Sequence, residues 1–338
     1  MSGPSVAVVG ATGAVGREML ATLERRRFPV GSLRLMASAR SAGTVMETPW
    51  GPATVEDLAA ADPAGVDVAL FSAGGSRSRE HAPRFAEAGA VVVDNSSAWR
   101  MDARVPLVVV GVNDHAAAGH EGIIANPNCT TMVLLMALAP LHRAAGLSSM
   151  VVSSYQSVSG TGQQALRQLD AEVEHFARER DALQFGGWTE IPSEVYPRPI
   201  GWNVLAFAGS AADAGYTDEE WKLVNETRKI LEAPEVLVEP TCVRVPTVVG
   251  HGISATAWFD RDVAVDEAIE LIGAAPGVRV WTDRVPTPLD SAGVDDVLVG
   301  RVRATVGRPG GIAFWVVGDN LRKGAALNTV QIAELLVG

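Results

Sequence analysis

The feature that most limits the fold is a glycine-spaced loop between an apolar run and a helix-like run. Residues 6–9 (VAVV) are followed by GATGAVG at residues 10–16, and then by a helical pattern over residues 17–27. Glycines here allow a tight turn and a close approach of the backbone to a pyrophosphate, which binds at the helix N-terminus. A plain structural turn is the alternative, but the strand–loop–helix context favours a dinucleotide site.

Apolar runs and helical patterns alternate over the first third of the chain. We expect strands at residues 33–37, 66–72, 91–93 and 107–111, and a helix at residues 81–88. Continuous valine-rich strands separated by helices are typical of a parallel sheet covered on both faces. The sequence therefore predicts an α/β fold with a Rossmann-type nucleotide-binding domain.

The residues after the second expected strand bear on which dinucleotide is bound. An NAD site places Asp or Glu here for the ribose 2′-hydroxyl, whereas this chain has Ser38, Arg40 and Ser41. The arginine supplies a fixed positive charge and the serines supply hydroxyl donors, which suits a 2′-phosphate. A solvated turn arginine is the alternative. We expect NADP(H) as the cofactor.

One of the two cysteines lies in the sequence NPNCT at residues 126–130. It follows the apolar residues 123–125 and precedes a helical run over residues 132–141, which places Cys129 at or near a helix N-terminus. The N–H groups and the dipole at that position favour a thiolate, which is a nucleophile for carbonyl carbon. The alternative is a buried structural cysteine.

The pattern changes after Cys129. We expect a strand running into a Ser/Gly loop at residues 150–160, a helix at 163–180 and an irregular aromatic, proline-rich segment at 184–204. Thr217 and Glu220 form a capping box for a helix reaching residue 231. Strands at residues 254–259, 299–306 and 312–317 predict an α+β domain with a mixed, mostly antiparallel sheet. We place the domains at residues 1–127 and 128–321, with a last helix at about 322–338 returning to the first domain.

Composition excludes several classes of function. The net charge of −11 argues against nucleic acid or an anionic membrane as the main partner. No apolar stretch reaches the roughly 18 residues that span a bilayer, and the chain enters a strand at residue 5 without room for a signal peptide. Two cysteines cannot build a disulfide framework, so we expect a cytoplasmic setting. No cluster of His, Cys and carboxylates has metal-ligand spacing.

Eight blocks of the sequence together resemble the aspartate-β-semialdehyde dehydrogenase family, in order and from end to end. They are GATGAVG, SARSAG, DNSSAWR, NPNCTT, QSVSG, EEWK, RVPTVVGH and GDNLRKGAALNTVQIAE. The family converts 4-aspartyl phosphate and NADPH to L-aspartate 4-semialdehyde and phosphate, a step shared by lysine, threonine and methionine synthesis. The resemblance implies these small-molecule substrates, a catalytic and dimerisation domain after the first domain, and a homodimer or homotetramer.

The resemblance also assigns roles to single residues. Cys129 resembles the nucleophile that forms a thioester, His251 the acid–base and Gln156 the residue that orients the substrate. By residue type alone, His251 between two glycines is a loop residue and Gln156 is a polar turn residue, so the roles rest on the resemblance. An ordinary histidine pKa lies close to neutral pH, as acid–base catalysis requires.

The substrate carries a phosphoryl group, a carboxylate and an ammonium group, so its site needs cations and an anion. Arg244 resembles the ligand of the carboxylate through a bidentate fork. Arg100 and Lys222 resemble the phosphate-binding pair, and Glu219 the acidic residue that meets the ammonium or holds Lys222. An exposed i,i+3 ion pair is the alternative for Glu219 and Lys222.

The cofactor residues that the family pattern implies fall into four groups. The pyrophosphate loop comprises Gly10, Thr12, Gly13, Ala14 and Val15, and the adenosine-phosphate end comprises Ser38, Arg40 and Ser41. The third-strand loop contributes Ser72 and Gly74. Ser159 and Gly160 would lie near the nicotinamide, and Asn320 would bind its carboxamide.

Three other interpretations fit the sequence less well. N-acetylglutamyl-phosphate reductases have Gly before the cysteine and Tyr after it, where this chain has Asn128 and Thr130. Glyceraldehyde-phosphate dehydrogenase shares Cys-Thr-Thr, but its following Asn is Met132 here and its acidic NAD residue is absent. A non-catalytic NADP-binding regulatory protein would have no reason to keep the nucleophile and acid–base together.

Overall fold

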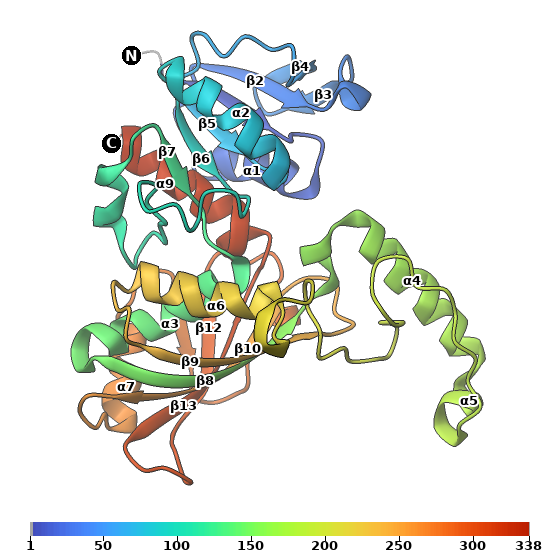
Figure 1. Ribbon diagram of the computed structural model, residues 1–338, viewed down its shortest axis with the longest axis vertical. Helices are drawn as coiled ribbons and strands as arrows, with labels where there is room; N and C mark the ends of the chain where they lie inside the picture. The colour runs from blue at the N-terminus through green and yellow to red at the C-terminus, as the bar shows by residue number, and fades with distance from the viewer. Residues whose placement is uncertain (1–2, 338) are drawn as a thin grey trace. The chain divides into compact units, whose positions relative to one another are not determined.

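The structure of the chain is a computed structural model that describes residues 3–337. It contains two compact units, each built around its own sheet (Figure 1). Unit 1 comprises Met1–Ala139, Asn225–Pro234 and Leu321–Gly338, and unit 2 comprises Pro140–Val224 and Glu235–Asn320.

Unit 1 is built on a seven-stranded sheet of order β3-β4-β2-β1-β5-β6-β7. All neighbours are parallel except the β3–β4 pair, and β5 is buried along its whole length. Apolar residues can fill successive positions because helices cover both faces. The strands are β1 Ser5–Val9, β2 Ser32–Ala37, β3 Val45–Thr48, β4 Gly51–Asp57, β5 Val68–Phe71, β6 Val91–Asp94 and β7 Ile123–Ala125.

The helices of unit 1 include one from the far end of the sequence. α1 (Ala14–Arg25) and α2 (Gly75–Glu87) follow β1 and β5. A π-helical turn at Arg322–Ala326 leads into α9 (Leu327–Val337), whose Val330 and Ile332 join the same apolar core as Val6 and Val8 of β1. The Rossmann-type arrangement that the glycine loop and the alternating pattern predict is confirmed.

The strands of unit 1 differ from the predicted ones in two places. The β3–β4 hairpin was not expected, and the strand predicted at residues 107–111 is wrong: only Leu107 makes a bridge, to Ala125 of β7. Side-chain amides take the place of a ladder in this segment. Asn113 Oδ1 accepts the Val109 N–H at 2.8 Å, and Asn328 Oδ1 accepts the Val110 N–H at 2.9 Å.

Unit 2 is built on a six-stranded mixed sheet of order β11-β12-β13-β10-β8-β9. The β11–β12 and β8–β9 pairs are parallel and the three pairs between them are antiparallel, which confirms the predicted mixed, mostly antiparallel sheet. The strands are β8 Leu147–Gln156, β9 Leu237–Arg244, β10 His251–Phe259, β11 Val278–Trp281, β12 Val297–Ala304 and β13 Gly311–Gly318. Strand β11 and helix α7 (Val265–Gly273) were not expected.

Strand β8 shows how one face of this sheet is buried and the other is not. Met150 and Val152 are buried, whereas Val151 and Tyr155 are 48% and 37% exposed. This alternation is what a half-buried strand produces. The exposed positions leave apolar side chains on the open face of the sheet.

Helices α4 (Gln163–Arg178) and α5 (Arg180–Phe185) extend away from the sheet of unit 2 (Figure 1). The predicted single helix over 163–180 is therefore interrupted at Glu179. The irregular segment predicted at 184–204 begins only at residue 186, because Gln184 and Phe185 belong to α5, and residues 186–204 contain no helix or strand. Glu172, which is 2% exposed, holds that segment by accepting the N–H groups of Ile200 and Gly201 at 2.6 and 2.7 Å. Charged hydrogen bonds thus anchor a segment that has no ladder of its own.

Two further helices complete the scaffold. α3 (Cys129–Ala145) begins at the cysteine, as the sequence predicts. α6 (Asp218–Ile230) begins with the predicted capping box: the Thr217 N–H donates to Glu220 at 2.7 Å, and the Glu220 N–H donates to Thr217 Oγ1 at 3.3 Å. A short helix α8 (Pro288–Ser291) lies between β11 and β12. Within residues 3–337, no helix is both long and apolar enough to cross a membrane.

Candidate active site

The glycine loop of unit 1 is shaped to receive a pyrophosphate. Gly10 has φ +87°, and a Cβ there would meet Ser72 O at 2.2 Å. A Cβ on Gly16 would lie 2.3 Å from Gly10 O, so this glycine lets α1 approach the loop closely. No side chain caps α1 at Gly13, which leaves the N-terminal amides of the helix to a ligand. Thr12, Ala14 and Val15 line the same loop.

The other cofactor positions of unit 1 lie at the ends of neighbouring strands. Ser38 directly follows β2, and Arg40 and Ser41 form a short 3₁₀ turn there, with Arg40 exposed. Ser72 and Gly74 lie between β5 and α2, and β5 pairs with β1. Ligands of α/β sheets bind at these carboxyl ends of the strands, so the positions fit an extended dinucleotide.

Cys129 is held at the start of α3 by the residues that precede it. Asn128 is the N-cap, because its Oδ1 accepts the N–H groups of Thr130 and Thr131 at 2.9 and 3.3 Å. This is a good residue for the position, and Asn-Cys-Thr-Thr could have revealed it from the sequence. The half-buried Cys129 is therefore the first residue of a capped helix, where a thiolate is favoured.

Asn126 ties this turn to the rest of unit 1. It is fully buried; its amide nitrogen donates to Asn95 Oδ1 at 2.5 Å, and its Oδ1 accepts from Asn328 of α9 at 2.7 Å. Asn328 in turn accepts from the buried Lys323 at 3.0 Å. Sequence reasoning missed these partners, which lie far apart along the chain.

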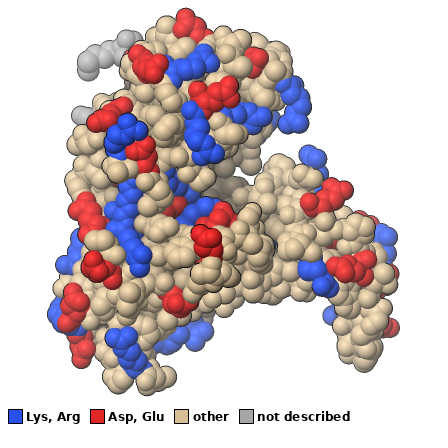
Figure 2. Space-filling model, viewed as in Figure 1, with Lys and Arg blue, Asp and Glu red and all other residues tan. Residues whose placement is uncertain are grey.

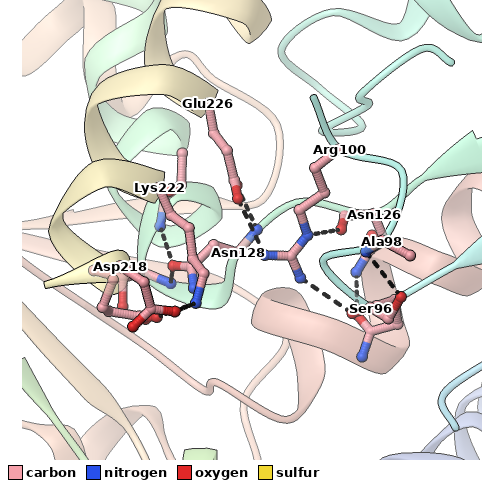
Figure 3. A network of polar contacts seen from close by, with 12 residues as sticks. Ser96, Ala98, Arg100, Asn126, Asn128, Asp218, Lys222 and Glu226 are labelled. Carbon is pink, nitrogen blue, oxygen red and sulfur yellow. Dashed lines mark hydrogen bonds and ion pairs between the residues drawn. The ribbon is translucent and has the colours of Figure 1, made fainter. Parts of the chain in front are cut away.

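Arg100 lies beside the same turn, as Figure 3 shows. Its guanidinium donates to Asn126 O at 3.0 Å, to Asn95 O at 3.1 Å and to a carboxylate oxygen of Glu226 at 3.1 Å. The second oxygen of Glu226 accepts the Asn128 N–H at 2.6 Å. Arg100 and Cys129, which the sequence predicts to act on the same substrate, are thus linked through one set of hydrogen bonds in unit 1.

His251 is fully buried at the start of β10 in unit 2. The Ser157 N–H donates to its Nδ1 at 3.0 Å, so the neutral imidazole carries its proton on Nε2. Burial, and then the charge of Arg244, lowers the pKa of His251 to about 3. The pKa of His251 therefore lies well below the ordinary histidine value, and the imidazole is neutral at physiological pH.

Gln156, Glu219 and Lys222 are joined in a second network of unit 2. Gln156 Nε2 donates to Glu219 at 3.3 Å, and Lys222 Nζ donates to Glu219 at 3.0 Å and to Asp218 at 2.7 Å. Burial lowers the pKa of Lys222, but the carboxylates of Glu219 and Asp218 outweigh it and leave the pKa raised. Glu219 is 8% exposed, so the pair is not the exposed ion pair that its spacing alone would favour.

Arg244 ends β9 and is 6% exposed. Its Nη1 donates to Ser157 O at 2.8 Å, while its buried Nε has no hydrogen-bond partner among the described residues. A Cβ on Gly160 would lie 3.3 Å from Arg244 Nη1 and 3.5 Å from His251 Nε2. Glycine at 160 therefore leaves room beside both side chains.

Asn320 joins the loops that carry these groups. Its Oδ1 accepts the Gly250 N–H at 2.9 Å and the Ser157 hydroxyl at 3.0 Å, and its Nδ2 donates to Ser159 at 2.9 Å. The Gly250 N–H fixes which end of the amide is the oxygen. Sequence reasoning singled out Asn320 and Ser159 but missed Ser157, whose backbone N–H sets the tautomer of His251.

The structure thus sorts the predicted residues into two sets. Unit 2 brings together Gln156, Ser159, Gly160, Glu219, Lys222, Arg244, His251 and Asn320, and unit 1 holds Arg100, Cys129 and the dinucleotide loops. The second cysteine, Cys242, is fully buried, and burial raises the pKa of its thiol to about 12. Within residues 3–337, no group of three or more His, Cys, Asp or Glu side chains is arranged to hold a metal ion.

Charge on the surface is mixed rather than segregated. The chain carries a net charge of −11, yet Figure 2 shows basic and acidic residues interspersed over the visible face. A nucleic-acid surface would instead gather Lys and Arg on one face or along one groove. The visible face in Figure 2 therefore shows no such gathering of basic residues.

Comparisons with known proteins identify the family of the chain. A family model described as "Semialdehyde dehydrogenase, NAD binding domain" matches residues 5–120, and "Semialdehyde dehydrogenase, dimerisation domain" matches residues 138–323. Fold and site thus define a semialdehyde dehydrogenase, an oxidoreductase with a nicotinamide-dinucleotide domain.

Individual relatives narrow the class. The chain is 51% identical over 336 residues to an aspartate-semialdehyde dehydrogenase of Streptomyces akiyoshiensis, with 98% of each covered. It is 50% identical to that of Corynebacterium glutamicum, with 98% and 99% covered. A solved aspartate semialdehyde dehydrogenase II from Vibrio cholerae, complexed with ASA, has a TM-score of 0.94 at 40% identity and covers 100% and 99%. The chain belongs to the aspartate-semialdehyde dehydrogenase family.

These matches decide several sequence predictions. The family, the fold class and the activity of an NAD(P)-dependent oxidoreductase in amino-acid biosynthesis are confirmed. The prediction of NADP(H) is confirmed at the level of an NAD(P)-binding domain. The match to a dimerisation domain supports an oligomer of this chain.

Proposed function

We propose that the chain reduces 4-aspartyl phosphate to L-aspartate 4-semialdehyde through a thioester on Cys129. The observation that carries this proposal is the position of Cys129 as the first residue of α3, after a side-chain cap from Asn128. The capped N-terminus favours the thiolate, which attacks the acyl carbon and forms the C–S bond. The bond between the acyl carbon and the bridging oxygen then breaks, and inorganic phosphate leaves with that oxygen.

The cofactor, when bound, supplies the hydride that reduces the thioester. The chain's own contribution is to direct protons and orient the acyl group. Neutral His251 offers its Nε2–H to the acyl oxygen, because Ser157 occupies Nδ1. That hydrogen bond strengthens as negative charge develops on the oxygen. When the tetrahedral centre collapses, the C–S bond breaks, the aldehyde is released and Cys129 returns as thiolate. Gln156, held by Glu219, is proposed to orient the substrate.

The substrate's charges have matching groups. The unpartnered Nε of Arg244 and the neighbouring nitrogen of its fork suit the α-carboxylate. Lys222 stays protonated beside Glu219 and Asp218, and with Arg100 it is proposed to bind the phosphoryl group. Glu219 is proposed to meet the ammonium group while holding Lys222. Arg244→Ala should therefore raise the KM for semialdehyde, whereas Lys222→Ala should act mainly on phosphate; the reverse pattern would refute this assignment.

Preference for NADP over NAD is part of the proposal. Ser38, Arg40 and Ser41 follow β2, where an NAD enzyme has a carboxylate for the ribose. Arg40 is exposed and carries the charge that a 2′-phosphate needs. The variant Arg40→Asp should lose selectivity for NADP. Unchanged selectivity for NADP over NAD in that variant would refute this assignment.

The deciding experiment follows the NADPH absorbance band with L-aspartate 4-semialdehyde, NADP and inorganic phosphate. Phosphate-dependent NADPH production by the wild type, lost in Cys129→Ser, is the expected result. Dinucleotide binding should persist in the variant, because the glycine loop is untouched. If the wild type binds NADP and produces no NADPH, the proposed substrate is wrong.

We further propose a homodimer or homotetramer in the cytoplasm. The open face of the unit 2 sheet presents Val151, Tyr155 and the 64% exposed Leu237, which are apolar groups that a second copy could cover. The two cysteines form no disulfide with each other, as a reducing compartment would keep them. Light scattering that gives a monomer at micromolar concentration would overturn the oligomer, and cell fractionation tests the location.

A further inference from the structure

Glu226 is a buried carboxylate of α6 that the proposed mechanism does not use. Its side chain is 1% exposed. One oxygen accepts from Arg100 Nη1 at 3.1 Å and the other accepts the Asn128 N–H at 2.6 Å (Figure 3). A buried charge is retained only where its partners repay the loss of water. Arg100 is itself a proposed ligand of the phosphoryl group, and Asn128 directly precedes the proposed nucleophile.

The first partner is the guanidinium of Arg100, which has five N–H donors in a planar fork. Three are committed: to Asn126 O, to Asn95 O and to Glu226. One N–H remains on each terminal nitrogen, which is the pair that grips a phosphate bidentately. Without the Glu226 contact, Nη1 of Arg100 would no longer be held in position by a hydrogen bond.

The second partner is the backbone of the turn before the nucleophile. Asn128 caps α3 with its side chain while its own N–H points to Glu226. The carboxylate therefore lies at the positive end of the α3 dipole, where a negative charge is favoured. The same end of the helix favours the Cys129 thiolate, so the two negative charges compete for it.

The chemistry of the two contacts selects a carboxylate at this position. Both oxygens accept, from Arg100 on one side and from Asn128 on the other. A glutamine has one acceptor and one donor at its tip, so in either orientation its NH₂ group would face another N–H. Glutamine, although of the same size, cannot replace Glu226 without breaking one contact.

We propose that Glu226 is a positioning residue that orients the Arg100 fork for phosphate and fixes the Asn128–Cys129 turn. It acts through these two neighbours and does not touch substrate. This inference rests on the proposed function for its phosphate half, and on the fold alone for its cysteine half. The negative charge of Glu226 also disfavours the thiolate form of Cys129.

The test uses the full chain with Glu226→Gln, and Glu232→Gln as the matched control. Glu232 is also in unit 1, but its carboxylate is exposed and pairs with His115. We expect Glu226→Gln to raise the KM for phosphate by about 10-fold or more, since Nη1 of Arg100 is no longer held in the orientation that binds phosphate. The KM for semialdehyde should change less than about twofold, and Glu232→Gln should match the wild type.

The second readout is the pH dependence of Cys129 alkylation by iodoacetamide, which needs no substrate. Loss of the Glu226 charge should lower the midpoint by about 0.5–1 pH unit, on Coulomb's law at an effective dielectric for a partly buried site. A residue with a purely structural role would not make the thiol more acidic while weakening phosphate. Wild-type KM for phosphate together with a wild-type alkylation midpoint in Glu226→Gln overturns the inference.

Two further outcomes are a variant that does not fold and a wild type that shows no activity. If Glu226→Gln does not fold, Glu226→Asp decides, since it keeps the charge but shortens the reach: a raised KM for phosphate with an unchanged midpoint supports the inference, and an unchanged KM opposes it. If the wild type shows no phosphate-dependent activity, the proposed function fails. The alkylation midpoint then decides the cysteine half by itself.

Discussion

Asn328 of α9 is expected to contribute more to stability than any neighbour on its helix. It is fully buried and all four hydrogen-bonding positions of its amide are used. Nδ2 donates to Val108 O at 2.8 Å and to Asn126 Oδ1 at 2.7 Å, and Oδ1 accepts from Val110 N at 2.9 Å and Lys323 Nζ at 3.0 Å. Replacing it removes one partner from four groups at once, three of them in buried hydrogen bonds.

The expected magnitude follows from those four bonds. A buried hydrogen bond contributes about 1 kcal/mol net, so Asn328→Ala should lower the free energy of unfolding by about 4 kcal/mol. Thr329→Ala is the matched control: Thr329 is the next residue on α9, equally buried, and its hydroxyl bonds only Ala325 O of its own helix at 2.9 Å. That single local bond predicts a loss of about 1 kcal/mol.

Urea unfolding at one protein concentration measures the difference, since an oligomer's midpoint depends on concentration. With a slope of about 2–3 kcal/mol per molar, Asn328→Ala should shift the midpoint by about 1–2 M relative to the wild type. Because Asn328 also holds Asn126, alkylation of Cys129 should change in rate in this variant and not in Thr329→Ala. Equal midpoints for the two variants would refute the reasoning.

Three further outcomes are expected. His251 has a folded pKa of about 3, so below its unfolded pKa of roughly 6.5 the unfolded chain binds more protons than the folded one. Between pH 6.5 and 5 the wild type should therefore lose about 1.6 kcal/mol of unfolding free energy that His251→Asn does not lose, as measured by urea midpoints against pH. Iodoacetamide at pH 8 should label Cys129 and spare Cys242, whose thiol pKa is about 12, and equal labelling by peptide mass mapping would contradict its burial. Gly160→Ala should lower kcat/KM by about 3- to 10-fold because its Cβ displaces Arg244 and His251, whereas Gly307→Ala, with open space around it, should not.

The elements that could be predicted from the sequence are those whose contacting residues lie close together along the chain. The strand–glycine–helix unit at Gly10 is readable because turn, helix start and apolar run follow one another. The Thr217–Glu220 capping box spans a single turn. Cys129 at the start of α3 was predicted from the helical run after it. In each case the residues that form the contact lie within a few positions of one another.

The parts that sequence reasoning missed depend on partners far along the chain. The strand predicted at residues 107–111 fails because Asn328, 218 residues beyond Val110, takes its N–H. The pKa of His251 depends on burial and on Arg244, and its tautomer on the Ser157 N–H, 94 residues earlier. Glu226 meets Asn128 across 98 residues. No periodicity or local motif in one sequence carries these pairings.

The place of α9 in the core of unit 1 has a consequence for how the protein is made. Val6 and Val8 leave the ribosome first, yet the residues that they pack with, Val330 and Ile332, are synthesised only after the whole of unit 2. At about 5–20 residues per second, the roughly 320 residues from Val8 to Val330 take about 16–64 s to synthesise, and the apolar core is incomplete for that time. Completion of the dinucleotide unit therefore waits until α9 has been synthesised. A chain that stops before α9 would expose its apolar core to chaperones and proteases.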